Sequence, residues 1–227
     1  MLLDLFSGGG GVAKAARRLG FDSISMDLRM GPDQDVCYHK NLATIKKMIF
    51  GKLVNGVMLA PPCSSFSMAR NRYPVRSRQW PMGFMNLKEL DREKVRIGNR
   101  CMKAAILIST WCQQAGVPCC IENPQTSYMW VTPAMKEHLD SATVLDVHQC
   151  AFGSRWRKAT RLAFSCPTSS TLWCKEYLDK YRCHGRHGFC SFRVGHKHVT
   201  LEGSLTTKAA AYPMRLNNFI TRNLLGL

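Results

Sequence analysis

Cys63 lies in a segment whose composition favours chemistry over core packing. Residues 61–67 have the sequence Pro-Pro-Cys-Ser-Ser-Phe-Ser and follow an apolar run, residues 57–60, that is typical of a buried strand. Free cysteines are often buried and inert, but two prolines and two serines are poor neighbours for a core position. A thiolate on a stiff turn at the end of a strand can attack an electrophilic carbon. We therefore predict that Cys63 is a nucleophile.

Glu122 stands at the end of another predicted strand, residues 119–121, and is followed by Asn123 and Pro124. An acid in that place points into the crevice at the carboxyl edge of a sheet, where open α/β folds bind ligands. If a thiolate attacks C6 of cytosine, a protonated carboxyl at N3 stabilises the charge that enters the ring. We expect Glu122 to supply that carboxyl; the alternative is an acid that caps the next helix.

A run of four glycines, residues 8–11, lies between a predicted strand and a predicted helix. Glycines let the backbone approach a ligand closely, and the start of a helix offers free N–H groups. Asp27 ends the next strand about 20 residues later, where an acid can accept from ribose hydroxyls. Neither Asp4 nor Asp27 needs a phosphate partner, which suits S-adenosylmethionine better than a dinucleotide. The alternative for Asp27 is a surface acid at a strand end.

The elements that would position these residues alternate short apolar runs with amphipathic stretches, a pattern that indicates βαβ units and a parallel sheet. The pattern predicts strands at residues 2–6, 22–27, 54–60, 119–121, 144–147 and 162–164. It predicts helices at residues 12–19, 41–51, 87–115, 134–139 and 209–225. The fold class expected from these elements is α/β.

The chain has 227 residues and a net charge of +17. Such a field attracts polyanions, so nucleic acid is the natural partner; a generally basic soluble protein is the alternative. The charge is concentrated toward the end, because residues 151–227 hold 13 Lys and Arg against 3 Asp and Glu. No apolar stretch approaches the ~20 residues that span a bilayer, so we expect no membrane partner.

The 11 cysteines are an odd number, which argues against complete disulfide pairing. The first residues lack the basic start and the cleavage site of a signal peptide. We therefore expect an intracellular protein with reduced thiols, in the nucleus if eukaryotic or in the cytoplasm if bacterial or viral.

The loop after the Cys63 segment is basic and has no acid between residues 68 and 80. Arginines bind phosphates, and aromatic side chains such as Tyr73 and Trp80 can stack on bases. A base inside a duplex must be flipped out before it can react, and this loop could close over it. The arginines expected to contact nucleic acid are Arg70, Arg72, Arg76 and Arg78. The alternative is a solvated basic loop.

In their order and spacing, these segments resemble the motifs of the DNA (cytosine-5)-methyltransferase family. Residues 4–11 resemble its cofactor loop, residues 62–67 fit its Pro-Cys-x-x-Phe-Ser nucleophile motif, and residues 121–123 resemble its Glu-Asn motif. The resemblance implies that Cys63 and Glu122 are catalytic. It implies a Rossmann-like S-adenosylmethionine-dependent methyltransferase fold with a small Cys/His-rich C-terminal region. The residues that it assigns to S-adenosylmethionine are Asp4, Phe6, Ser7, Gly8, Gly10, Asp27, Pro61 and Tyr212.

Two further motifs of the family are only partly matched. The resemblance implies an arginine, just before a strand, that reaches the cytosine O2; we expect Arg161 in this role, with Arg157 as the second choice. Residues 211–216 resemble the family's last motif, but Ala209 and Ala210 stand where the family has Gly-Asn. Tyr212 is assigned to the cofactor pocket on this basis.

Residues 166–198 are rich in cysteine and histidine, and zinc would take four such side chains in a tetrahedron. No Cys-x-x-Cys pair is present, and the ligands that we favour are Cys183, Cys190, His196 and His198, the two histidines as alternatives for one position. A basic surface that contacts DNA is the competing interpretation. The family keeps its target-recognition region here, and so short a region predicts relaxed specificity or a protein partner that supplies it.

We therefore predict a catalytic S-adenosylmethionine-binding domain at residues 1–165, a Cys/His-rich target-recognition-like region at 166–205, and a C-terminal helix at 206–227 that returns to the catalytic domain. The predicted reaction is methyl transfer from S-adenosylmethionine to C5 of a flipped cytosine in double-stranded DNA, through a covalent adduct with Cys63. One alternative is a cytosine-5 methyltransferase that acts on tRNA. Another is a degenerate homologue that only binds nucleic acid, although intact Cys63 and Glu122 argue against it.

Overall fold

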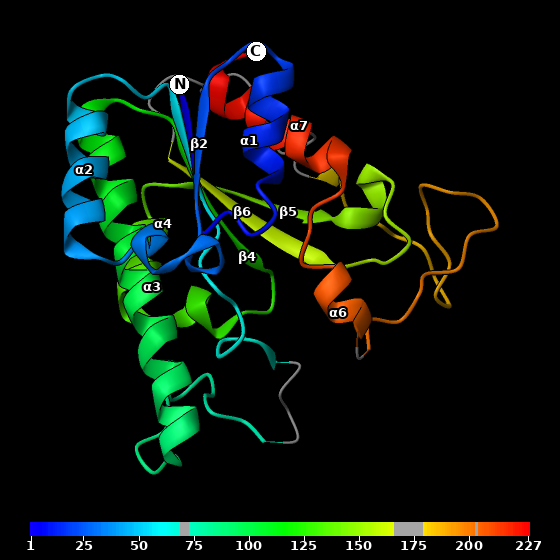
Figure 1. Ribbon diagram of the computed structural model, residues 1–227. Helices are drawn as coiled ribbons and strands as arrows, with labels where there is room; N and C mark the ends of the chain where they lie inside the picture. Colours follow the sequence, from blue (N-terminus) through cyan, green and yellow to red (C-terminus); the bar gives the residue numbers. More distant parts are fainter. Residues whose placement is uncertain (69–72, 166–178, 203) are drawn as a thin grey trace.

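The computed structural model describes residues 1–68, 73–165, 179–202 and 204–227 (Figure 1). Its strands are β1 (Leu2–Leu5), β2 (Ser23–Met26), β3 (Gly56–Leu59), β4 (Cys119–Pro124), β5 (Thr143–His148) and β6 (Ala159–Ser165). Its α-helices are α1 (Gly11–Arg18), α2 (His39–Phe50), α3 (Glu89–Ala115), α4 (Pro133–Leu139), α6 (Ser204–Lys208) and α7 (Met214–Leu225). The predicted α/β class is confirmed.

The six strands form one sheet in the order β2-β1-β3-β4-β6-β5. The first four strands of this order are parallel, whereas β6 runs antiparallel to both β4 and β5. The purely parallel sheet expected from the sequence is therefore wrong at this edge. Residues 149–158 join β5 to β6, and this connection is too short for the crossover that a parallel neighbour requires.

The chain passes from β1 to β2 on one side and later to β3 on the other, so the direction of winding switches at β1. In open α/β sheets such a switch point leaves a crevice at the carboxyl ends of the strands, where ligands bind. The glycine run follows β1 and the Cys63 segment follows β3. The fold is thus a Rossmann-like sheet that directs both segments to one crevice.

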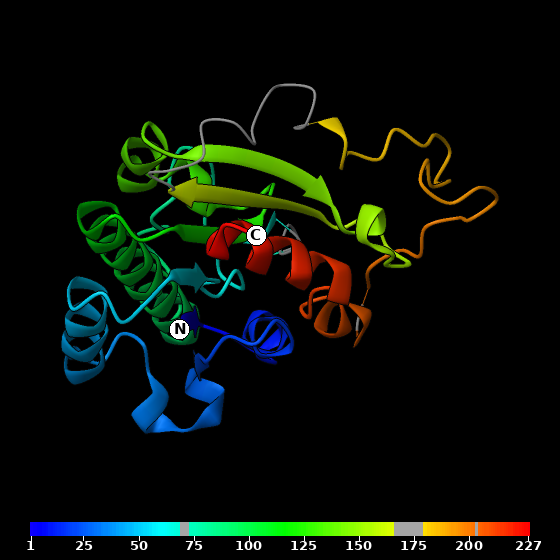
Figure 2. The same ribbon diagram turned by 90° about the horizontal axis from the view of Figure 1, so that it is seen from above.

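Helices cover both faces of the sheet (Figures 1 and 2). Apolar side chains of α2, α3 and α4 pack on one face, where Ile45, Ile108 and Met135 belong to one buried cluster. Helices α1 and α7 cover the other face, where Val12 and Leu216 are buried together. A Cβ on Gly11 would lie 2.6 Å from Nδ2 of Asn217, so glycine lets α1 start directly against α7.

Helix α3 is the longest element and holds the Cys63 segment in place. It ends at Gly116, which adopts the left-handed conformation (φ 71°) that favours glycine. On the helix face toward the loop, a Cβ on Gly98 would overlap Oγ of Ser65 and crowd the Phe66 ring. The absence of a side chain at Gly98 therefore allows the loop after Cys63 to lie directly on the helix.

The last third of the chain departs most from the sequence expectation. The helix predicted at residues 209–225 begins only at Met214, after Pro213, and a short helix α6 precedes it. The described residues between 179 and 202 extend away from the sheet as irregular chain with one antiparallel bridge, Phe189 to Lys197 (Figure 2). Among the described residues, no helix is both long enough and apolar enough to cross a membrane.

Candidate active site

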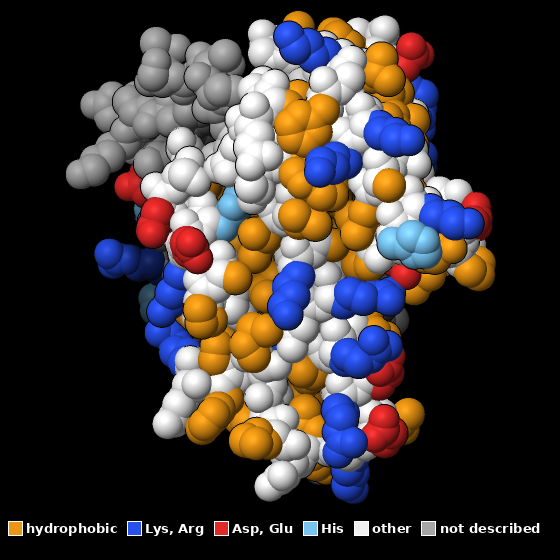
Figure 3. Space-filling view, turned by 90° about the vertical axis from the view of Figure 1, so that its left-hand side faces the viewer, with side chains coloured by type: hydrophobic (Ala, Val, Ile, Leu, Met, Phe, Trp, Pro, Cys, Tyr) orange, Lys and Arg blue, Asp and Glu red, His pale blue; other side chains and the backbone are white. Residues whose placement is uncertain are grey.

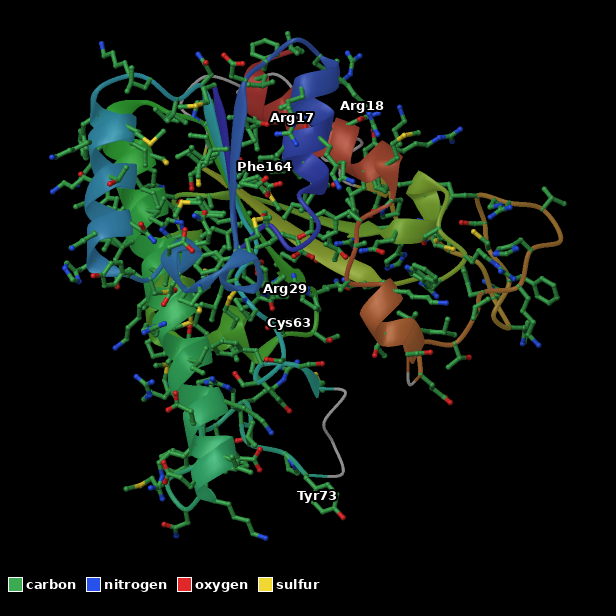
Figure 4. All side chains as sticks on the ribbon, in the orientation of Figure 1. Arg17, Arg18, Arg29, Cys63, Tyr73 and Phe164 are labelled. Atoms are coloured by element: carbon green, nitrogen blue, oxygen red, sulfur yellow. The ribbon has the colours of Figure 1, made fainter. Side chains whose placement is uncertain are left out.

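Cys63 lies half-buried at the carboxyl edge of the sheet, on the same edge as Arg29, which follows β2 (Figure 4). The turn is closed by the N–H of Phe66, which donates to the Cys63 carbonyl at 2.9 Å. Nδ2 of Asn123 donates to the Pro61 carbonyl at 2.8 Å and so ties the ends of β3 and β4 together. Burial raises the pKa of the Cys63 thiol, the Glu122 carboxylate raises it further, and the Lys158 ammonium partly lowers it. The thiol therefore shares one electrostatic environment with Glu122 and Lys158.

Glu122 is 5% exposed and projects from the end of β4. The Tyr212 hydroxyl donates to its Oε2 at 2.6 Å, whereas its Oε1 is buried and has no hydrogen-bond partner among the described residues. Burial raises the pKa of this carboxyl, and the opposing effects of Lys158 and the Tyr212 hydrogen bond do not cancel the rise. Glu122 is thus suited to hold a proton, and it keeps one oxygen available for a ligand.

Tyr212 contacts the carboxyl group of Glu122. The family resemblance had assigned Tyr212 to the cofactor pocket. Burial and the charge of Glu122 raise its pKa well above the usual range, so the phenol keeps its proton and acts as a donor. The charge of Asp4 also raises this pKa. In this structure Tyr212 holds the Glu122 carboxyl in position.

Arg161 does not face Glu122, although it was the first choice for the cytosine O2. In the β4–β6 register, Arg161 pairs with Asn123 and Leu162 pairs with Glu122, and cross-strand partners share a face. Arg161 therefore projects from the opposite face of the sheet. There it makes two hydrogen bonds to Asp146, at 2.7 and 2.8 Å. The expectation for Arg161 is wrong because a difference of one residue along a strand moves a side chain to the other face of the sheet.

Arg157, the second choice, bonds to the Cys/His-rich segment: its Nη2 donates to the Cys183 carbonyl at 2.6 Å. Among the described residues, the cation whose charge lowers the pKa of both Cys63 and Glu122 is Lys158. Its Nζ donates to the Ala209 carbonyl at 3.0 Å. Sequence reasoning missed Lys158 because the family pattern asks for arginine. Alternate residues of a strand share one face, so the spacing of residues 158, 160 and 162 could have indicated Lys158.

The glycine run forms an arch that connects β1 to α1 and lies against the end of β2, where the N–H of Ser7 donates to the Met26 carbonyl at 3.1 Å. Gly8 and Gly10 have φ values of 56° and 64°, in the left-handed region that favours glycine. The N–H of Gly8 donates to Oδ2 of Asp27 at 2.8 Å. The predicted cofactor residue Phe6 also adopts a positive φ, 56°, and Oγ of Ser7 is buried without a partner among the described residues. The arch therefore holds one unsatisfied polar group beside a helix start.

Asp27 is buried and lies under the arch. Burial opposes its ionisation, but hydrogen bonds from Arg29 and from Gly8 outweigh burial and lower its pKa. Its Oδ1 accepts from the backbone N–H of Arg29 at 2.9 Å and from Nε at 3.1 Å. The Arg29 side chain is 72% exposed, so solvent weakens this ion pair and ligand hydroxyls could replace the guanidinium.

Asp4 lies beneath the arch rather than along it. It is 2% exposed, and its Oδ2 accepts the backbone N–H of Ala13 at 2.9 Å. Burial raises its pKa to about 7, against the lowering effect of the N–H donors of Ala13 and Val12. In this structure Asp4 supports the first turn of α1, and the cofactor contact assigned to it stays a prediction.

Asp4→Asn is expected to change how stability depends on pH. The folded protein keeps the Asp4 proton to about pH 7, whereas an unfolded carboxyl loses it near pH 4. The contribution of the Asp4 carboxyl to the stability of the wild-type protein is thus fully present below pH 4 and is lost as the pH rises through 7. The neutral amide should be more stable than wild type at pH 8, by at most about 4 kcal/mol, and equal to it near pH 4. Thermal melts at both pH values test this, with the exposed Asp22→Asn as the control. If the two variants depend on pH in the same way, the prediction is wrong.

Arg76 is 1% exposed and cannot contact nucleic acid, which corrects its place among the DNA-binding arginines. Its guanidinium lies 3.7 Å from the centroid of the Phe66 ring. It donates to the carbonyls of Ser65, Pro81 and Val95 and to the side chains of Ser65 and Asn99, at 2.7–3.1 Å. Arg76 therefore fastens the Cys63 loop to α3. Arg78 is exposed, and Arg70 and Arg72 lie outside the described residues.

Arg76→Met is expected to destabilise the fold by about 3 kcal/mol or more, because it leaves several buried carbonyls without donors. Arg78→Ala is the matched control, since it removes an exposed arginine two positions away and should change the melting temperature little. Melting temperatures of both variants test this. Equal and small shifts would contradict the structural role of Arg76.

Tyr212, which donates to Glu122, also lines an open cavity of about 790 Å³; Glu122 and Cys63 themselves do not line it. Its walls come from residues 150–156, from the Cys/His-rich segment and from the start of α7. Four basic residues and no acid line it: Arg155, Arg193, Lys208 and Arg215. This cavity therefore offers a basic surface to a polyanion.

Four of the thiols and imidazoles come together beside this cavity. The ligand atoms of Cys150, Cys183, Cys190 and His198 all lie within 4.8 Å of one another. His196, a predicted metal ligand, is not among them; its Nε2 lies 3.4 Å from the Arg155 carbonyl. Cys150 takes that place and was missed, because it lies 33 positions before Cys183 in the sequence. Cys166 and Cys174 lie outside the described residues.

No family model matches this sequence, and no curated protein matches it. Among solved structures it is similar to the S. pombe Dnmt2 methyltransferase, with 12% identity, a TM-score of 0.46, and 83% of this chain and 56% of that chain covered. It is also similar to the Entamoeba histolytica methyltransferase EhMeth, with 14% identity, a TM-score of 0.41, and 76% of this chain and 55% of that chain covered. The chain thus spans a little over half the length of either protein.

Proposed function

We propose that this protein transfers a methyl group from S-adenosylmethionine to C5 of cytosine in double-stranded DNA. The observation that carries the proposal is that Oε1 of Glu122 is buried without a hydrogen-bond partner among the described residues, while the charge of Glu122 acts on the Cys63 thiol. A raised pKa on a buried acid beside a thiol is an arrangement typical of catalytic sites. The substrate class and the site of methylation rest on this chemistry and on the motif resemblance.

The arch between β1 and α1 supports a nucleoside cofactor. It offers the buried Oγ of Ser7, which has no partner among the described residues, the N-terminal N–H groups of α1 and the nearby ionised Asp27. Asp27 would accept from ribose hydroxyls after Arg29 swings away. S-adenosylmethionine, when bound, supplies an electrophilic methyl group.

In the proposed reaction, Cys63 gives its thiol proton to a solvent base, the resulting thiolate forms a bond to C6 of the cytosine, and the ring electrons move toward N3. Glu122 donates its proton toward N3, which makes C5 nucleophilic. C5 would then take the methyl group as the S–CH3 bond of S-adenosylmethionine breaks and S-adenosylhomocysteine leaves, and a solvent base removes the C5 proton. The electrons of the C5–H bond re-form the C5–C6 double bond and expel the Cys63 thiolate, and Glu122 recovers its proton.

Lys158 would stabilise the negative charge that appears in this site. It lowers the pKa of Cys63 and therefore favours the thiolate, and it lies where the family resemblance expects an arginine for the cytosine O2. A fixed cation in a buried site is worth more than one in water. We propose that Lys158 takes over the role assigned to Arg161.

The basic cavity supports a nucleic-acid substrate more specifically than the net charge does. On the α2 and α3 side, lysine and arginine side chains are scattered among apolar and acidic ones (Figure 3). The cavity, in contrast, gathers Arg155, Arg193, Lys208 and Arg215 without an acid in its lining. Exposed Tyr73, Arg78 and Trp80 would form part of the contact surface below the sheet.

Competition between duplex DNA and tRNA tests the substrate class. Purified protein is given equal nucleotide concentrations of both with labelled S-adenosylmethionine, and the label in each is counted. We expect label in DNA cytosine, and we expect this label to fall when Lys158 is replaced by alanine. Lys180→Ala is the control for the loss of one basic charge. Label in tRNA alone would move the proposal to an RNA cytosine-5 methyltransferase.

A second function, nucleic-acid binding without catalysis, is favoured by one observation: Arg161 is engaged by Asp146 and cannot reach a base beside Glu122. Calorimetric titration with S-adenosylmethionine separates the two functions. An enzyme should bind about one cofactor per chain. A degenerate homologue should show no heat of cofactor binding while it still retains duplex DNA.

A further inference from the structure

Cys150, Cys183, Cys190 and His198 form a cluster of metal-ligand type outside the catalytic pair. Their three Sγ atoms and the imidazole nitrogen all lie within 4.8 Å of one another, and Cys183 Sγ is 3.8 Å from Nε2 of His198. With a Zn–S bond of about 2.3 Å, the edge of a tetrahedron is about 3.8 Å. The four atoms therefore need only small movements to reach tetrahedral coordination.

The backbone supplies these ligands from three separate segments. Cys150 lies on the 3-10 helix η5 (Gln149–Phe152), between β5 and β6. Cys190 and His198 meet across the small hairpin closed by the Phe189–Lys197 bridge; the N–H of His198 donates to Gly188 and that of Cys190 to His196. Cys183 Sγ accepts from the N–H of Ser191 at 3.3 Å, the kind of donor that supports a metal-bound thiolate.

The Cys/His-rich segment has few buried side chains to hold it. Among the described residues 179–202, only Cys183 and Cys190 are buried, while Phe189, Phe192 and Val194 are 47%, 40% and 104% exposed. Small, loop-rich regions without an apolar core are held by metals or by disulfides. Three thiols and one imidazole in a tetrahedral set match structural zinc.

We propose that Cys150, Cys183, Cys190 and His198 bind one zinc ion, which clamps residues 183–198 onto η5. The clamp fixes one wall of the basic cavity, because Phe192 and Arg193 line it opposite residues 150–156. It also fixes the segment that carries Lys158, since Arg157 donates to the Cys183 carbonyl. The zinc is structural, as all four positions are occupied by protein ligands.

The first test is the zinc content of the purified full-length chain after dialysis, measured by atomic emission. We expect about one zinc per wild-type chain and less than about 0.1 in Cys150→Ser and His198→Ala. His196→Ala is the matched control: it removes a histidine two positions from His198 and should keep the full zinc content. A wild-type chain without zinc would overturn the proposal, and so would loss of zinc in His196→Ala with retention in His198→Ala.

A second measurement applies even if the ligand variants fail to fold. Wild-type protein loaded with Co²⁺ should show the strong visible bands of tetrahedral cobalt and thiolate charge-transfer absorption. Chelation should speed tryptic cleavage at the exposed Arg186, Arg193 and Lys197, with cleavage elsewhere unchanged. Octahedral cobalt spectra, chelator-independent cleavage, or a disulfide between two of the three cysteines in freshly purified protein would contradict the zinc site.

Discussion

Cys63→Ala is expected to lower the rate of methyl transfer by about 10⁴-fold or more, because Cys63 forms the bond to C6 in the proposed reaction. The fold should survive, since Cys63 is half-buried on a turn that is held by backbone bonds and by Asn123. Single-turnover rates on duplex DNA, beside melting temperatures of both proteins, measure the two effects separately. Cofactor affinity should stay within about twofold of wild type.

Cys37→Ala is the matched control, because it removes another half-buried cysteine away from Glu122. It should leave the rate of methyl transfer within about threefold of wild type. If Cys63→Ala kept more than a tenth of the wild-type rate, a direct nucleophilic role for Cys63 would be ruled out.

Glu122→Gln is expected to slow methyl transfer by about 10²- to 10⁴-fold, the usual contribution of a positioned general acid. The amide keeps the volume of the side chain and can still accept from the Tyr212 hydroxyl, but it has no proton to give to N3. The loss should therefore appear in the rate of the chemical step and not in DNA affinity. Pre-steady-state kinetics with saturating DNA measure this.

Tyr212→Phe provides the comparison for Glu122→Gln. It removes the hydrogen bond that lowers the pKa of Glu122 but leaves the carboxyl and the ring in place. The carboxyl then holds its proton more firmly, and we expect a loss of only about tenfold. A loss as large as that of Glu122→Gln would show that Tyr212 itself takes part in the reaction.

The positions of Cys63 and Glu122 could be predicted because their signals are local. An apolar run long enough for a buried strand places whatever follows it at the edge of the sheet, and the cysteine and the acid follow two such runs. The structure brings both to the carboxyl edge, where the charge of Glu122 raises the pKa of the Cys63 thiol. The glycine arch was predictable for the same reason, since it follows β1 directly.

The roles of Lys158 and Arg161 could not be predicted, because they depend on the register of β6 against β4. The sequence shows a strand near residue 162 but not that it runs antiparallel, nor which residue faces Glu122. A shift by one residue exchanges the two faces. Arg161 consequently pairs with Asp146 on the far face, while Lys158 acts on the catalytic pair.

Arg76 and Cys150 show a second limit, which concerns burial. Arg76 stands in a basic loop and has the same local context as the exposed Arg78, yet it is enclosed by carbonyls of the loop and of α3. Cys150 lies far from the Cys/His-rich segment in the sequence and joins it only because η5 turns beside that segment. Such contacts arise from tertiary packing, which residue type and spacing do not encode.

Covalent trapping on duplex DNA tests the central claim most directly. If C5 of the target cytosine carries fluorine in place of hydrogen, no proton can leave C5, so the Cys63–C6 bond cannot break after methyl transfer. We expect wild-type protein with S-adenosylmethionine to form a 1:1 adduct with such DNA that resists denaturation, and peptide mapping should place it on Cys63. Cys63→Ala should form none. Methylated cytosine from wild-type protein without any adduct, or an adduct on another residue, would contradict the mechanism.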